Sequence, residues 1–211
     1  RADRAADLPV TPHPLILARL RDEVRAVCQL ADGTCVADAP PPAAVFPGSF
    51  NPLHHGHRTL AAAAAARLGA PVHFELSAAN VDKPDLTPAD LAGRLAQFVA
   101  VGPVWVTRAA AFEKKADLFP GAAFVLGYDT AARLIDPRYY GDSPARRDAA
   151  LRKLLDRGCR VVVGGRVGAD GRFREWDPAG VAAEFAGLFD AIPEAAFRAD
   201  VSSTALRRAA T

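Results

Sequence analysis

The sequence predicts an α/β fold, a Rossmann-like three-layer sandwich with a mainly parallel sheet and helices on both faces. Short apolar runs alternate with helical stretches from residue 43 onward, which is the pattern of strands joined by crossover helices. About 50% of the 211 residues are hydrophobic, so the chain can bury a sizeable core. Because a crossover between parallel strands is right-handed, helices are expected on both faces of the sheet.

The alternation can be followed element by element. Thr87 and Pro88 are expected to begin one helix and Gly102 to end it, and Gly69 is expected to end the helix before it, as such residues commonly do at helix termini. The glycines after residue 163 predict a hairpin turn rather than a phosphate loop. Strands are expected at residues 43–46, 71–76, 103–107, 122–127 and 159–165, and helices at 57–69, 88–102, 111–119, 129–135 and 143–158.

The first 42 residues have a different pattern. Residues 40–42 are three prolines, which form a stiff extended connector. We therefore expect residues 1–42 to be an N-terminal helical appendage with a Pro-rich linker, and residues 43–211 to be the main domain. The appendage could be the end of a preceding domain, a helix packed on the sheet or an oligomer contact. Apolar residues predict a helix over 14–30 because they recur three and four apart, at Leu17, Leu20, Val24 and Val27.

Composition excludes several classes of protein. The formal charge is +2 with 24% charged residues and no long run of one sign, which argues against a nucleic-acid coat or a membrane-surface protein. No apolar run approaches the roughly 18 to 20 residues that span a bilayer. Three cysteines without C-x-x-C spacing indicate reduced thiols in a cytoplasmic protein. The chain begins at Arg1 and contains no methionine, so we expect it to start inside a longer gene product or after processing.

The sequence carries neither of the two commonest phosphate-binding signatures. No pair of glycines has the G-x-G spacing of the dinucleotide fingerprint, and no G-x-x-x-x-G-K-[ST] segment is present. In open α/β sheets, ligands gather beyond the carboxyl ends of the strands, where the strand order reverses. A site is therefore expected in the loops that follow the strands.

The first of these loops has the composition of an anion site. It reads PGSFNPLHHGH and leads into an alanine-rich helix. Gly48 allows the backbone to approach a ligand closely, and exposed amides at the start of the helix favour a phosphate. His54 and His57 are three residues apart on one side of the first turn, and Gly56 leaves room for a nucleotide. His55, between them, is expected to be a bystander.

Two motifs resemble those of a known superfamily. The segment GSFNPLHHGH resembles the first signature of the HxGH nucleotidyltransferase superfamily, which is cytidylyltransferase-like. About 145 residues later, DVSSTALRR matches the second signature, [I/V]-S-S-T-x-x-R. The resemblance covers roughly residues 43–211. It implies transfer of a nucleotidyl group from a nucleoside triphosphate to a phosphate-bearing acceptor, with release of pyrophosphate.

The resemblance also implies roles for individual residues. His54 and His57 would donate to the α-phosphate, with the imidazolium form open to at least one of them, and Arg207 would supply a permanent positive charge to the triphosphate. Mg²⁺ is expected to accompany ATP, although no protein ligand for it is evident. The other motif residues expected to contact ATP are Gly48, Ser49, Phe50, Gly56, Ser202, Ser203 and Thr204.

Two further positions follow strands of the predicted sheet. Lys83 follows the second strand, where the superfamily commonly places a basic side chain against the phosphates. Gly127 and Asp129 end the fourth strand as G-x-D, which resembles the adenylyltransferase pattern in which a carboxylate holds the ribose. Lys83 could instead be a solvated loop charge, and Asp129 could be a helix N-cap.

Simpler interpretations apply to other features. The histidine cluster alone would also suit an adventitious metal, but a structural zinc site would need matching ligands elsewhere, and only His13 and His73 remain. Trp105 could stack on an acceptor ring, although aromatic residues in strands usually belong to the core. Residues 137–148 could be a lid over the acceptor or an ordinary surface loop.

The motif combination looks most like nicotinamide mononucleotide adenylyltransferases, which join ATP to the mononucleotide to make the dinucleotide. The aromatic residues that this family sets against the nicotinamide ring have no evident match, which leaves the acceptor open. Phosphopantetheine adenylyltransferase and cytidylyltransferases that act on alcohol phosphates are alternatives. Another is a nucleotide-binding regulatory module without turnover.

Overall fold

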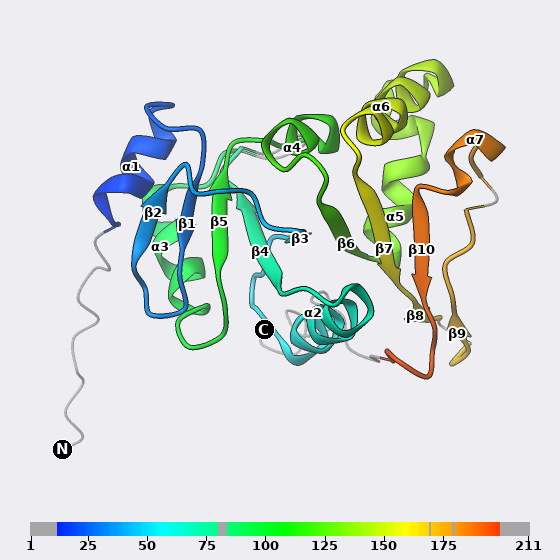
Figure 1. Cartoon of the computed structure of the whole chain (residues 1–211), viewed down its shortest axis with the longest axis horizontal. Coiled ribbons are helices and arrows are strands. Elements are labelled where there is room, and N and C mark those ends of the chain that lie inside the picture. The colour runs from blue at the N-terminus through cyan, green and yellow to red at the C-terminus, as the bar shows by residue number, and fades with distance from the viewer. Residues whose placement is uncertain (1–11, 80–83, 169, 179, 199–211) are drawn as a thin grey trace.

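One large sheet runs through the middle of the molecule (Figure 1). The structure is a computed structural model and describes residues 12–79, 84–168, 170–178 and 180–198. Within these residues, eight strands form the sheet in the order β10-β7-β6-β3-β4-β5-β1-β2. Their bounds are β1 Val27–Gln29, β2 Cys35–Ala37, β3 Ala44–Pro47, β4 Val72–Ser77, β5 Val104–Thr107, β6 Ala123–Gly127, β7 Arg160–Gly164 and β10 Phe189–Ile192.

The topology is that of a doubly wound sheet. Strands β3, β4 and β5 are parallel and extend to one side, whereas β6, β7 and β10 continue from β3 to the other side, also in parallel. The direction of winding therefore reverses between β3 and β6. Only β1 and β2 are antiparallel to their neighbours in this sheet, as far as the described residues show. The predicted fold class is confirmed.

Helices cover both faces of the sheet. One apolar layer includes Ile16, Leu60 and Leu91, which come from the first three helices, and the other includes Leu134 and Leu151, from the fifth and sixth. In Figure 1, α4 and α6 lie together on one side, away from α2. The bounds are α1 Pro14–Leu20, α2 His55–Leu68, α3 Pro88–Ala96, α4 Phe112–Leu118, α5 Tyr128–Ile135, α6 Pro144–Asp156 and α7 Ala183–Ala186, with a 3-10 helix, η1, at Pro137–Tyr140.

Most expected elements appear where the pattern predicts them. The glycine-rich segment after β7 forms the expected hairpin, with β8 (Arg166–Val167) antiparallel to β9 (Phe173–Arg174). The helix α3 ends at Ala96 with Gln97 as its C-cap, so the predicted end at Gly102 is wrong. Hydrogen-bonded turns follow it up to Gly102. Strand β10 and the short helix α7 were not predicted, because this stretch mixes apolar and charged residues without a clear period.

The N-terminal helix is shorter than the sequence suggests. A helix over residues 14–30 is wrong, because α1 ends at Leu20 and Asp22 has a left-handed φ of 61°. Residues 27–29 instead form β1, whose three side chains are all buried and whose backbone pairs with β5. The 3–4 spacing of apolar residues also suits a short helix followed by a buried strand. Residues 27–37 thus extend the main sheet, while the division into domains at residue 42 stays a prediction.

The alanine-rich helix α2 packs closely on the sheet. Its buried small residues include Ala61 and Ala64, and Gly69 ends it in the left-handed conformation, as predicted. Near this end, Arg67 forms a two-pronged ion pair with Asp190 of β10, with Nε–Oδ2 at 2.7 Å and Nη2–Oδ1 at 2.5 Å. The helix is therefore held to the far strand of the sheet as well as to the strands beneath it. Among the described residues, none of the helices has the length and apolarity needed to cross a membrane.

Candidate active site

Two helices begin side by side at the carboxyl edge of the sheet. Helix α2 follows β3, and α5 follows β6 directly. These two strands are neighbours, with Ala44 opposite Ala123 and Val45 opposite Phe124. The winding of the sheet reverses between them, and this is the position where ligands bind in open α/β folds. The first motif and the G-x-D segment are thus brought to one place.

The two predicted histidines of the first motif are in contact. His54 is the N-cap of α2 and His57 lies in its first turn. Their rings stack with centroids 3.6 Å apart and an interplanar angle of 24°. The backbone N–H of His54 donates to Nδ1 of His57 at 3.3 Å. Because Nδ1 accepts this bond, the proton of the neutral His57 ring resides on Nε2, which makes Nε2 a hydrogen-bond donor. His55, between them, is exposed.

Burial controls the charge of these rings. It lowers the pKa of His57 from 6.5 to about 4, with a further contribution from the neighbouring His54. Burial and then His55 also lower the pKa of His54. In the ligand-free protein both rings are therefore neutral at pH 7, because burial disfavours the charged form. The imidazolium form would need a bound anion, whose negative charge would raise the pKa.

Two phenylalanine rings pack against the His57 ring. Phe50 is 1% exposed and lies edge-on to His57, with ring centroids 5.0 Å apart, and Phe46 approaches the same ring at 5.9 Å. A Cβ at Gly48 would meet the Phe50 ring at 2.6 Å. The lack of a side chain at Gly48 is therefore required by packing. With its ring in the core, Phe50 can offer a ligand only its backbone, and the role expected for it in ATP binding stays a prediction.

Arg94 of α3 and Gln97, the C-cap of this helix, hold the loop that leads to the histidines. The side chain of Gln97 accepts from the Leu53 N–H at 2.8 Å and donates to the Phe50 carbonyl at 3.2 Å. The Arg94 guanidinium donates to the carbonyl of Ser49 at 2.8 Å. Buried or half-buried backbone groups of an irregular loop need such partners. Sequence reasoning missed Arg94 and Gln97, because nothing in their spacing links them to a loop more than 40 residues earlier.

The start of α5 is open by comparison. Gly127 is its N-cap, with an ordinary φ of −75°, and a Cβ there would have nothing within 4 Å. Asp129 lies in the first turn rather than at the N-cap, so the capping alternative for Asp129 is wrong. Its exposed carboxylate pairs with Arg166 of β8. Arg166 is a partner that the sequence did not suggest, since it lies in a separate hairpin.

Phe197, which precedes the second motif in the sequence, packs near α2. Phe197 is 7% exposed and belongs to the same apolar layer as Leu60. A Cβ at Gly164, the last residue of β7, would meet Leu60 at 2.5 Å and Phe197 at 3.0 Å, so these three residues lie together. Leu60 is one helical turn after His57. Phe197, four residues before Val201, is thus held close to the first motif.

Several predicted site residues lie outside the described part of the chain. These are Lys83, Ser202, Ser203, Thr204 and Arg207. Gly56 is buried in the first turn of α2, while Ser49 is exposed. In the ranges that the structure describes, no group of three His, Cys, Asp or Glu side chains is placed to hold a metal ion.

Two other segments singled out in the sequence have defined places. Trp105 is 2% exposed in β5, and its Nε1 donates to Nδ1 of His73 at 3.1 Å, so the core interpretation is confirmed. Residues 137–148 form η1 and the first turn of α6, and the Tyr140 hydroxyl donates to the Leu134 carbonyl at 2.9 Å. Both the lid and the surface-loop interpretations stay open for this segment.

A buried ion pair lies beside the loop and was not predicted. Glu75 of β4 and Lys115 of α4 are 0% and 4% exposed, and Nζ lies 2.7 Å and 2.8 Å from the two carboxylate oxygens. Thr107 of β5 donates to the same carboxylate at 2.5 Å. The Glu75 carbonyl accepts the Gly48 N–H at 3.0 Å, which joins this strand to the loop. A single acid in the apolar run VHFEL was the available signal, since buried charges need partners.

The fold and the site together define a class of protein. It is a doubly wound α/β protein in which a stacked histidine pair begins a helix at the reversal of strand order. The chain belongs to the cytidylyltransferase-like family, whose model matches residues 45–209. The general activity class is therefore that of a nucleotidyltransferase. A comparison with curated proteins found no significant match.

Proposed function

We propose that this protein transfers an adenylyl group from ATP to the phosphate of nicotinamide mononucleotide and releases pyrophosphate. The observation that carries the proposal is the stacked pair His54 and His57 at the start of α2, beside the open start of α5. Such transfers are catalysed mainly by positioning and by donors aimed at the charge that develops on phosphate oxygens. A rigid pair of imidazoles at a helix N-terminus suits this chemistry.

In this proposal the histidines act on the α-phosphate. The Nε2–H of His57 donates to an α-phosphate oxygen, and the hydrogen bond from the His54 N–H to Nδ1 keeps the ring in the required tautomer. As the acceptor phosphate attacks in line, negative charge grows on the equatorial oxygens and on the leaving pyrophosphate. Arg207 and Lys83 are proposed to meet the leaving group and the acceptor.

The start of α5 is proposed to hold the nucleoside part of ATP. The space above Gly127 allows a nucleotide to lie against the backbone, and Asp129 is exposed and able to accept from ribose hydroxyls. Asp129 would then exchange its contact with Arg166 for the sugar. This G-x-D arrangement favours ATP over CTP in the proposal because it resembles that of adenylyltransferases.

Mg²⁺ is proposed to enter with the triphosphate. The ion would be bound by phosphate oxygens and water, as is common for ATP, and it would neutralise the charge of the pyrophosphate. No side chain of this chain is assigned to it.

Pyrophosphate release tests the proposal. The full chain is incubated with Mg²⁺, ATP or CTP, and one of four acceptors: nicotinamide mononucleotide, nicotinate mononucleotide, phosphopantetheine or an alcohol phosphate. Release with ATP and a pyridine mononucleotide is expected. Release only with CTP and an alcohol phosphate, or only with phosphopantetheine, would show that the proposed acceptor is wrong and would identify another. ATP binding without release in any combination would instead indicate a regulatory module.

One substitution tests the role of the histidine pair. His57→Ala is expected to lower kcat by about 10²- to 10³-fold, the usual loss for one donor to a developing oxyanion, with a much smaller change in the KM for ATP. His55→Ala is the matched control, because this neighbouring histidine is exposed. An unchanged kcat in His57→Ala would overturn the mechanism.

A further inference from the structure

The loop between β3 and α2 contains a strained residue. Phe50 has a φ of 41°, in the left-handed region that residues other than glycine rarely adopt. Its ring is buried and packs edge-on against Phe46, Phe74 and Phe98, so the side chain is fixed by the core. Backbone strain of this kind persists only where the surrounding contacts hold it, and it often marks a functional site. The contacts that hold the Phe50 backbone therefore bear on function.

The side-chain amide of Gln97 joins two parts of this loop. Its Nε2 donates to the carbonyl of Phe50 at 3.2 Å, and its Oε1 accepts the N–H of Leu53, three residues further on, at 2.8 Å. Both ends of the amide are therefore used on the loop. Arg94 also donates to the loop, at the Ser49 carbonyl, but this contact is exposed, so water can replace it.

Leu53 directly precedes the histidine pair. The peptide group that joins Leu53 to His54 carries the His54 N–H, which donates to Nδ1 of His57 at 3.3 Å. The hydrogen bond between Leu53 and Gln97 is thus one residue away from the bond that sets the His57 tautomer. A change in the direction of this short segment would move the His54 N–H away from Nδ1.

The end of α3, from which Gln97 extends, is itself fixed. Leu95 is 4% exposed and belongs to the apolar core. Its carbonyl accepts from the buried amide of Gln29, on β1, at 3.0 Å. The Ala100 N–H donates to the Ala31 carbonyl at 2.8 Å. An amide can hold a loop only when its own backbone is held, and these contacts meet that requirement.

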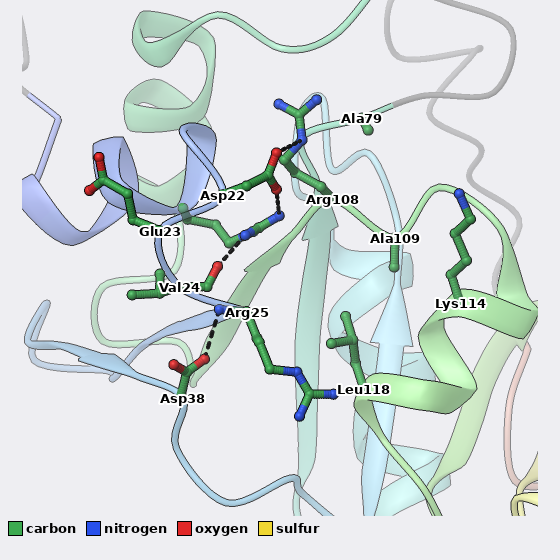
Figure 2. Close-up of a pocket in the computed structure, with 11 residues that line it drawn as sticks. Asp22, Glu23, Val24, Arg25, Asp38, Ala79, Arg108, Ala109, Lys114 and Leu118 are labelled. Atoms are coloured by element: carbon green, nitrogen blue, oxygen red, sulfur yellow. Dashed lines mark hydrogen bonds and ion pairs between the residues drawn. The ribbon is translucent and has the colours of Figure 1, made fainter.

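The N-terminal segment that contacts the end of α3 is attached to the sheet in its own right. Strand β1 pairs with β5. Before β1, Asp22 lies 3.6 Å from Arg108, which follows β5, and Figure 2 shows the two side chains facing each other. After β2, Asp38 accepts the backbone N–H of Arg25 at 2.9 Å (Figure 2). Residues that precede the family match at 45–209 thus support the end of α3.

We infer that Gln97 is a positioning residue, whose amide fixes the loop between β3 and α2 so that His54 and His57 keep their stacked geometry before substrates bind. The inference rests on the proposed nucleotidyl transfer, in which His57 donates to the α-phosphate. Donors to a developing charge are effective when they are fixed in advance. Gln97 acts through the loop and does not itself contact the reacting groups.

Two substitutions of Gln97 in the full chain test this inference. Gln97→Met keeps the length of the side chain and removes both hydrogen bonds to the loop. Gln97→Asn keeps the amide but is one carbon too short to reach both loop groups. Each is expected to lower kcat with ATP and nicotinamide mononucleotide by about ten- to a hundredfold, because a small misplacement of a catalytic group has an effect of this size. The KM for ATP is expected to change little.

A second measurement reports on the histidine itself. Titration of the ring protons by NMR is expected to give a pKa of about 4 for His57 in the wild type. In both Gln97 variants this pKa is expected to rise toward the ordinary value of 6.5, because a loosened loop lets water reach the ring. A purely structural role of Gln97 would lower the free energy of unfolding and leave the pKa and kcat of the folded protein unchanged.

The matched control is the other glutamine of the chain. Gln29→Met removes the hydrogen bond to Leu95 at the same end of α3, and this bond does not involve the loop. It is expected to lower the free energy of unfolding, measured by urea unfolding, and to keep kcat and the His57 pKa. Core packing of Leu95 and the bond between Ala100 and Ala31 still hold the helix end. An equal loss of kcat in Gln29→Met and Gln97→Met would overturn the specific role of Gln97.

The outcomes separate the inference from the proposed function. If the wild type releases no pyrophosphate with ATP and nicotinamide mononucleotide, but the His57 pKa rises in the Gln97 variants, the proposed function is wrong and the positioning role stands. If the wild type turns over and the folded Gln97 variants keep its kcat, or if they keep its His57 pKa, the inference is wrong. If neither variant folds, Gln97 is a structural residue, and the inference is again wrong.

Discussion

The starts of α2 and α5 are neighbours at one edge of the sheet, yet they are built in opposite ways. At α2, the His57 ring packs edge-on against buried Phe50, and the preceding loop is held by side chains of α3 and of its C-cap. At α5, Gly127 has open space above it, and Asp129 is exposed. The first is filled by protein, whereas the second leaves room for a ligand.

This difference matches the demands of group transfer. Donors to a developing charge are effective only when they are fixed in advance, because reorganisation during the reaction costs free energy. A binding surface for the nucleoside part needs space and accessible polar groups instead. Substitutions at the two helix starts should therefore differ in their effects on stability and on ligand binding.

Removal of the Phe50 ring should have the largest effect. Phe50→Ala is expected to lower the free energy of unfolding by about 3–5 kcal/mol, because a fully buried ring is lost and a cavity remains. Urea unfolding followed by circular dichroism measures it. An unchanged stability together with a raised KM for ATP would mean that the ring serves the ligand rather than the core.

The two glycines give a direct contrast. Gly48→Ala is expected to lower the free energy of unfolding by about 1–3 kcal/mol, because the new Cβ would overlap the Phe50 ring. Gly127→Ala is expected to change it by no more than about 0.5 kcal/mol, since its φ is ordinary and its surroundings are open. Gly127→Ala should instead weaken ATP binding in calorimetry. Equal free energies of unfolding for the two variants would show that Gly48 is not more tightly packed than Gly127.

The pH dependence of stability tests the burial of His57. Its pKa is about 4 in the folded chain and 6.5 as a free side chain, so protonation favours the unfolded state. Above about pH 6.5 the ring is neutral in both the folded and the unfolded chain, so it does not affect the free energy of unfolding. As the pH falls from there toward 4, the unfolded chain takes up the proton first and stability is lost. Because the ring is only partly buried, the loss is on the order of 1 kcal/mol.

The measurement for this prediction is a difference curve. The free energy of unfolding of the wild type is compared with that of His57→Gln between pH 7 and pH 4, so that the contributions of carboxylates cancel. The variant is expected to lose less stability on acidification. The control is His55→Gln, at the exposed neighbour. Parallel curves for wild type and His57→Gln would show that the ring titrates normally.

The fold was largely predictable because its signals are local. Apolar runs of four to six residues bounded by glycine and proline mark the strands of the parallel sheet, and Gly69 marks the end of α2. The predicted helix over residues 14–30 was wrong in its second half. The spacing of Leu17, Leu20, Val24 and Val27 fits a helix, but residues 27–29 pair with β5 and form a strand. Pairing between distant segments is not visible in local periodicity.

The candidate site likewise contains residues from local motifs, which could be predicted, and residues from distant elements, which could not. The places of His54, His57, Gly127 and Asp129 at the carboxyl edge of the sheet could be predicted because these residues belong to short motifs that follow strands. The residues that contact and hold these motifs could not be predicted, because they come from other elements of the folded chain. Examples are Gln97 under the loop, Arg166 beside Asp129, and the pair Glu75 and Lys115.

The ion pair between Arg67 and Asp190 has a consequence for motion. Helix α2 is fixed at its first turn by the loop contacts and at its last turn by β10, on the opposite side of the sheet's midpoint. A tilt of α2 relative to the sheet would therefore have to break one of these two attachments. We therefore expect the position of the histidines relative to the sheet to depend on the Arg67–Asp190 pair, although this pair lies at the other end of the helix.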